Sequence, residues 1–220
     1  MEGAEKGDTL AVTIHSIEVT RDYAVSALIP EFGGLCSTVF TRTLNPPLPP
    51  RVMLHPIRDN EITFSEELAI PTIPCEPFYG TMGTAPELEA ISSLAPGVHG
   101  GNMDAADVGP GNPLFLPVNV PGALLHIGDM HARQGDGEIC GAGGIESGCR
   151  VKVRCELAER PTSMTWPRIV NETHIMVAAM ARPAEEAFRT ALAEMILWLE
   201  DDYGFDRGEA YLFLGQVLEA

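Results

Sequence analysis

The chain carries its clearest structural signal in the stretch Arg150-Val151-Lys152-Val153-Arg154-Cys155-Glu156-Leu157. Apolar side chains alternate there with charged ones, which is the two-residue period of a β-strand with one face in the core. Leu10, Val12 and Ile14 repeat this alternation near the start of the chain, and a change of phase after them indicates a β-bulge near Ser16. The sequence therefore predicts a fold built mainly from strands.

One helix is expected near the C-terminal end, over residues 183–202. Pro183 suits the first helical position, and two glutamates follow it in the turn where the helix dipole favours acidic groups. Apolar side chains then recur every three or four residues: Phe188, Ala191, Leu192, Met195 and Leu199. Residues 211–217 are interpreted as a final strand. We predict a mostly β, sandwich-like single domain with one C-terminal amphipathic helix.

The composition, 45% hydrophobic and 20% charged over 220 residues, is that of a globular protein. A net charge of −17 excludes nucleic acid and anionic membrane surfaces as partners, and no apolar run is long enough to span a membrane. The five cysteines show no CxxC spacing, which argues against a disulfide framework and a structural zinc site. We therefore expect a cytoplasmic protein whose thiols are reduced and buried.

Between Pro96 and Glu146 the chain gathers the groups that metal sites and acid–base sites use. Half of its six histidines lie there, among carboxylates that are spaced by glycines. On a strand, Asp129 and His131 project from the same face because they are two residues apart. A carboxylate beside an imidazole suits a divalent metal such as zinc, a histidine oriented for proton transfer, or a purely structural hydrogen bond. The residues alone leave all three open.

Asp136 and Glu138 form a second cluster by the same spacing. Two carboxylates on one face repel each other, so a cation or protonation of one of them must relieve the pair, unless the segment is a solvent-facing acidic turn. We expect Ile139 and Cys140 to be buried, which would direct Glu138 into a site. Acidic neighbours would keep the Cys140 thiol protonated, so we interpret it as a small buried residue and not as a nucleophile.

The third cluster is His99-Gly100-Gly101-Asn102-Met103-Asp104. Its glycine pair permits a tight turn that would bring His99, Asn102 and Asp104 within reach of one point, although a loop with Asx turns explains the same residues equally well. Upstream, small residues around two aromatic side chains at 78–86 predict a buried turn beside a site.

Several long motifs closely resemble the acetamidase/formamidase family. They are Pro-Gly-Val-His-Gly-Gly-Asn-Met-Asp (96–104), Gly-Asp-Met-His-Ala-Arg-Gln-Gly-Asp-Gly-Glu (128–138), Gly-Ile-Glu (144–146), Pro-Phe-Tyr-Gly-Thr-Met-Gly-Thr-Ala-Pro (77–86) and Glu-Gly-Ala-Glu-Lys-Gly-Asp (2–8). The resemblance implies a β-rich, sandwich-like fold that hydrolyses a short-chain amide such as formamide or acetamide to the carboxylic acid and ammonia. It also implies a divalent metal, zinc or calcium.

The resemblance also implies roles for individual residues. Metal ligands would lie among His99, Asp104, Asp129 and His131, with Glu146 as a further candidate. Glu138 would be the general base, supported by Asp136. Asn102, or a backbone N–H near Gly100, would stabilise the oxyanion. We expect a small amide as substrate and a homo-oligomer as the assembly.

Compared with the family pattern, the chain lacks a segment before Glu2-Gly3-Ala4 and further strand after residues 214–220. We therefore expect residues 1–220 to form one acetamidase/formamidase-like domain that is truncated at both ends. A non-catalytic family member, acting as a subunit or a metal-binding remnant, is the alternative to an active amidase. A thiol hydrolase that uses Cys140 is a third hypothesis.

Overall fold

The structure, a computed structural model, describes residues 1–30, 32–35, 46, 48–159, 161 and 163–220. Its strands are β1 (Asp8–Val19), β2 (Tyr23–Leu28), β3 (Arg51–Arg58), β4 (Glu61–Ile62), β5 (Ile73–Pro74), β6 (Phe78–Gly83), β7 (Gly100–Asn102), β8 (Pro113–Pro117), β9 (His126–Arg133), β10 (Ile145–Glu146), β11 (Cys149–Glu159), β12 (Arg168–Val170) and β13 (Ile175–Val177). Two helices, α1 (Ala184–Tyr203) and α2 (Arg207–Val217), follow them.

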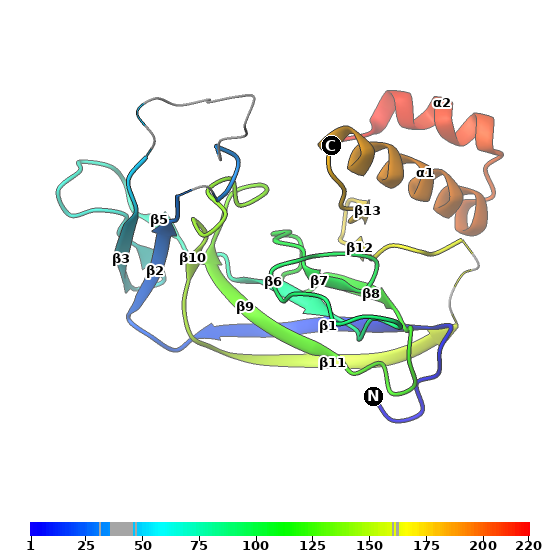
Figure 1. Cartoon of the computed structure of the whole chain (residues 1–220), viewed down its shortest axis with the longest axis horizontal. Coiled ribbons are helices and arrows are strands. Elements are labelled where there is room, and N and C mark those ends of the chain that lie inside the picture. Colours follow the sequence, from blue (N-terminus) through cyan, green and yellow to red (C-terminus); the bar gives the residue numbers. More distant parts are fainter. Residues whose placement is uncertain (31, 36–45, 47, 160, 162) are drawn as a thin grey trace.

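The strands form two sheets, and the helix pair lies at the opposite end of the molecule from β2 and β3 (Figure 1). One sheet has five strands in the order β11-β1-β8-β12-β13, and the other has eight in the order β5-β4-β3-β2-β10-β9-β6-β7. The predicted mostly β fold is confirmed. In the eight-stranded sheet β10, β9, β6 and β7 lie next to one another. The candidate site described below is built on these four strands and the loops that follow them.

The long pair of β1 and β11 forms from the two stretches that show the clearest alternation. Their antiparallel register runs from Asp8 opposite Glu159 to Val19 opposite Cys149, with an irregularity between Ile14 and Ser16. This confirms the predicted bulge. The alternate apolar side chains of β1 are almost fully buried, and those of β11 pack against the same core.

Strand β6 corrects the prediction of a buried turn at residues 78–86. All six of its residues are buried, but they run straight between β7 and β9 and form antiparallel pairs with both. The small residues that suggested a turn have another purpose here. Gly80 and Gly83 leave space for side chains from the neighbouring segments, so the glycines of this strand reflect close approach and not a change of direction.

The predicted helix at 183–202 is confirmed as α1, with Pro183 as its N-cap and Gly204, at φ 72°, as its C-cap. The strand predicted at 211–217 is wrong, because these residues belong to α2. A capping box between Asp206 and Glu209 starts this helix. Among the described residues, neither helix combines the length and the apolar character that crossing a membrane requires.

Candidate functional site

Strand β9 supplies the centre of the site. Asp129 and His131 project together, as their spacing predicts, and His131 Nε2 lies 3.1 Å from Asp129 Oδ1. His131 is fully buried, and the Phe78 ring contacts it edge-on at a centroid distance of 4.9 Å. Burial and this packing fix the imidazole, so that Nε2 faces Asp129 and Asp104 while Nδ1 lies against Gly144.

Asp104 enters the site from the loop that follows β7. Asn102 Nδ2 donates a hydrogen bond of 2.5 Å to Asp104 Oδ2, and the Thr81 hydroxyl donates one of 2.5 Å to Asn102 Oδ1. Gln134 Nε2 donates to the Asp104 backbone carbonyl at 2.7 Å. The remaining carboxylate oxygen, Asp104 Oδ1, is buried without a hydrogen-bond partner and lies 4.0 Å from His131 Nε2.

Gly80 makes room for both carboxylates. It stands opposite Asp129, between the cross-strand pairs Tyr79–Met130 and Thr81–Gly128. A Cβ atom at Gly80 would lie 2.5 Å from Asp104 Oδ1 and 2.5 Å from Asp129 Oδ2. Contacts that close essentially never occur for a Cβ atom, so the site requires glycine at this position.

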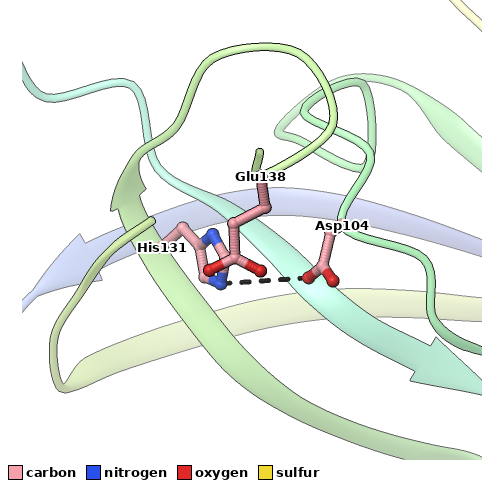
Figure 2. Close-up of side chains that lie close together, drawn as sticks. All are labelled: Asp104, His131 and Glu138. Carbon is pink, nitrogen blue, oxygen red and sulfur yellow. Dashed lines mark ion pairs between the residues drawn. The ribbon is translucent and has the colours of Figure 1, made fainter. Parts of the chain in front are cut away.

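Glu138 reaches the same point from the loop after β9 (Figure 2). The Gly144 backbone N–H donates to Glu138 Oε1 at 3.0 Å, which holds the carboxylate against His131. Asp104, His131 and Glu138 each offer a ligand atom, and these atoms lie within 4.8 Å of one another. Figure 2 shows the Glu138 carboxylate over the imidazole ring, and Asp104 beside the ring at the end of the dashed line.

Glu146 completes a second group around the same histidine. It lies on β10, where it is paired with His131 of β9. Ligand atoms of Asp129, His131 and Glu146 also lie within 4.8 Å of one another. His131 therefore belongs to both groups, and four carboxylates surround it.

Burial, hydrogen bonds and neighbouring charges shift the pKa values of the cluster. Burial, together with the charges of Glu138 and Asp129, raises the pKa of Asp104 from 3.8 to about 7. The hydrogen bond from His131 lowers the pKa of Asp129. Burial alone would lower the pKa of His131, but the hydrogen bond and charge of Asp129 raise it overall. Burial and the Asp129 charge raise the pKa of Glu146.

These properties fit a divalent cation. Asp104 Oδ1 is buried without a hydrogen-bond partner, it lies 4.0 Å from His131 Nε2, and carboxylate oxygens converge over Gly80. A cation relieves the repulsion that otherwise makes Asp104 retain a proton. The donor set, one imidazole among carboxylates, offers nitrogen and oxygen ligands to such an ion.

The structure does not bring His99 into either group. His99 is 4% exposed and lies beside His126, with ring centroids 6.1 Å apart. Burial, and then the charge of His126, lower the pKa of His99. Both rings line a separate cavity. Asp136 lies exposed on the turn before Glu138, and within the described part of the chain it makes no hydrogen bond or ion pair with the site.

The loop around Cys140 differs from the prediction of buried residues. Glu138 has a φ of 38° and Gly141 a φ of 76°, and the Gly141 N–H donates to the Glu138 carbonyl. This tight turn directs Ile139, which is 75% exposed, and Cys140 towards solvent. Glu138 nevertheless enters the site, because its side chain is held by Gly144 and not by burial of its neighbours. Cys36 lies outside the described residues.

Two contributors to the site were not identified from the sequence. Thr81 links Asn102 to Asp129 through its hydroxyl, at 2.5 Å from Asn102 Oδ1 and 3.4 Å from Asp129 Oδ2. Gly80 provides the space between the carboxylates. The run Gly80-Thr81-Met82-Gly83 could have revealed both. Glycine within a strand often marks a position where another group approaches the backbone closely.

Comparisons with known proteins find relatives that share the fold. The family model described as Acetamidase/Formamidase family matches residues 47–218. The crystal structure of an acetamidase from Yersinia enterocolitica is 42% identical and superposes with a TM-score of 0.88, covering 97% of this chain and 64% of that one. An acetamidase structure from Bacillus halodurans is 34% identical with a TM-score of 0.86, covering 98% of this chain and 68% of that one.

A curated acetamidase from Mycolicibacterium smegmatis is 26% identical over 188 residues, which are 72% of this chain and 46% of the relative. The chain thus spans just under two thirds of the Yersinia protein and less than half of the mycobacterial one.

Proposed function

Because the chain belongs to the acetamidase/formamidase family, we propose that it hydrolyses a short-chain linear amide, such as formamide or acetamide, to the carboxylic acid and ammonia. The observation that carries this proposal is the cluster around the buried His131, in which four carboxylates lie close to one imidazole. Such a cluster serves hydrolysis because it combines a cation site with a free carboxylate.

In this proposal Asp104, Asp129 and His131 hold a zinc ion, with Glu146 as a further ligand. The unpartnered Asp104 Oδ1 and the space over Gly80 support that role. A divalent ion bound there supplies a Lewis acid for the amide carbonyl and lowers the pKa of water. His99 lies outside these groups, so it is not among the ligands we propose here.

Glu138 acts as the general base. One of its oxygens accepts the Gly144 N–H, which leaves the other free to take a proton from the attacking water and to deliver it to the departing nitrogen. Asn102 uses one N–H of its amide to hold Asp104. Its second N–H remains available for the oxyanion that forms as water adds to the carbonyl.

We further propose that the protein works in the cytoplasm as a homo-oligomer. Its described cysteines are all free thiols, which suits a reducing compartment. Exposed apolar side chains on α2, namely Tyr211, Leu212, Phe213 and Val217, offer a surface that a second copy would cover. Light scattering on the purified protein tests the assembly, and a monomer at all concentrations would contradict it.

The proposed activity is tested by measuring ammonia release from formamide and acetamide, alongside metal analysis of the purified protein. We expect about one bound zinc per site, loss of activity on chelation, and recovery when zinc is restored. Bound metal without ammonia release would favour the non-catalytic alternative. Inactivation by N-ethylmaleimide combined with indifference to chelator would favour a thiol hydrolase that uses Cys140.

A further inference from the structure

We infer that the cavity lined by His99 and His126 binds the acyl group of the substrate, and that it accepts acyl groups several carbons longer than acetyl. This inference rests on the proposed amidase activity and specifies its substrate class. Four features of the cavity lead to it: its place beside the carboxylates, its lack of charge, its buried imidazole and its volume.

The cavity begins one side chain away from the carboxylate cluster. Thr81 forms part of its wall, and the Thr81 hydroxyl lies 3.4 Å from Asp129 Oδ2. Gly101 also lines it, directly before Asn102, which holds Asp104. A substrate whose carbonyl lies at the cluster therefore has the cavity within reach of its acyl group.

The chemistry of the lining selects an uncharged ligand. The wall is formed by Thr81, Ala85, Pro86, Ala90, Ile91, Ser92, Ser93, Ala95, His99, Gly101, Leu124 and His126. No carboxylate, ammonium or guanidinium group belongs to it, and most of its side chains are small or apolar. An alkyl chain buries apolar surface there, whereas a charged ligand would lose its hydration without gaining a counter-charge.

His99 contributes a buried imidazole to the cavity wall. The residue is 4% exposed, and its Nδ1 has no hydrogen-bond partner. A Cβ atom at Gly97 would lie 3.1 Å from that nitrogen, and one at Gly101 would lie 2.7 Å from Nε2. Close packing on both sides thus fixes the ring as a rigid part of the cavity wall.

The volume sets the size of the ligand. The cavity measures about 310 Å³, at the lower end of the range of roughly 300–1,000 Å³ for small-molecule sites. At about 30 Å³ for each water-sized group, it has room for about ten such groups. Acetamide has only four non-hydrogen atoms, so it would leave most of the cavity to water. An amide with an acyl chain of about six carbons fills the space and gains the corresponding apolar burial.

The test compares formamide, acetamide, butyramide and hexanamide in the ammonia assay with the zinc-loaded protein. We expect kcat/KM to rise with chain length up to hexanamide, by about tenfold for each 1.4 kcal/mol of added burial. In Ala90→Trp the indole should fill the cavity from its exposed wall and reverse the preference, so that hexanamide loses at least about tenfold relative to formamide. Leu88→Trp is the matched control, because Leu88 is 91% exposed and outside the lining, and it should keep the wild-type preference.

Binding measured without turnover separates this inference from the proposed activity. In Glu138→Gln, hexanamide should raise the thermal unfolding temperature, and Ala90→Trp in the same background should abolish the shift. Hydrolysis of formamide and acetamide with neither binding nor hydrolysis of hexanamide would overturn the acyl-cavity inference and leave the amidase intact. Binding of hexanamide that depends on Ala90, without ammonia from any amide, would support the cavity and overturn the amidase.

Discussion

Asp104 Oδ1 and Asp129 Oδ2 occupy the space where a side chain of Gly80 would begin, each 2.5 Å from the position of its Cβ atom. Because Gly80 has no Cβ atom, two carboxylates from different segments can lie side by side. We predict that Gly80→Ala forces them apart, lowers zinc affinity and ammonia release by at least about tenfold, and destabilises the fold by about 1–3 kcal/mol.

The control for this variant lies on the neighbouring strand. Gly128 is paired with Thr81, but a Cβ atom there meets nothing within 4 Å. Gly128→Ala should therefore keep both zinc and activity. Equal losses in the two variants, measured by metal analysis and the ammonia assay, would show that the loss at Gly80 reflects general strand sensitivity and not the carboxylates.

Replacing Glu138 tests the general base. Glu138→Gln keeps the shape of the side chain and removes its ability to accept a proton, so ammonia release should fall at least about 100-fold. Zinc content should stay at the wild-type level, because the proposed ligands are untouched. Asp136→Asn is the control in the same loop: Asp136 is exposed, and its replacement should change the rate by less than about twofold. Full activity of Glu138→Gln would contradict the assignment.

Metal content separates the two histidine environments. Asp129→Asn removes a carboxylate that contacts His131, so zinc affinity should fall at least about 100-fold. His99→Asn should leave zinc content unchanged, since His99 lies beside His126 and outside both groups around His131. The opposite result, with zinc lost from His99→Asn and kept by Asp129→Asn, would place the metal at the cavity.

The local pairings of this site were predictable from the sequence, but its assembly was not. Strand periodicity placed Asp129 beside His131, because residues two apart share a face whatever the strand pairs with. Nothing local shows that Asp104 converges on them, since that contact depends on β6 lying between β7 and β9. His99 was grouped with Asp104 by proximity in sequence and an expected tight turn, yet Gly100 and Gly101 belong to strand β7, and the two side chains lie in different places.

The error at α2 has a different cause. The run Tyr211-Leu212-Phe213-Leu214 is apolar throughout and rich in strand-forming residues, so it gave no helical period. Only Ala210 and Leu214, one turn apart, are buried in α2. The informative signal lay upstream in Asp206-Arg207-Gly208-Glu209, which has the spacing of a capping box.

That capping box gives a stability prediction that is independent of activity. The Asp206 side chain accepts the Glu209 N–H at 2.9 Å, and α2 packs against α1 through Ala210 and Leu214. Asp206→Ala should lower the free energy of unfolding by about 1 kcal/mol, measured in urea, with zinc content and turnover unchanged. Glu219→Ala, which alters an exposed acid beyond the helix, should have no comparable effect. A loss of activity in Asp206→Ala would indicate that the helix pair also supports the site.

The raised pKa of Asp104 predicts how the zinc-free protein responds to pH. Its pKa rises from 3.8 in an ordinary environment to about 7 in the fold, so between about pH 4 and 7 the folded state binds more protons than the unfolded state. The free energy of unfolding contributed by Asp104 must then fall as pH rises through this window. His131, whose pKa is also raised, acts in the same direction, because its stabilisation is complete below pH 6.5 and is lost at higher pH.

Urea unfolding at pH 5, 6 and 7 in the presence of chelator measures this dependence, with Asp104→Asn as the reference that cannot titrate. The difference in unfolding free energy, wild type minus Asp104→Asn, should decrease steadily as pH rises. Zinc should reverse the trend, because the cation replaces the proton as the partner of the carboxylate and binds more tightly as the carboxylate deprotonates. A difference that stays constant from pH 5 to 7 would show that Asp104 ionises normally. Burial and the neighbouring carboxylates would then not raise its pKa.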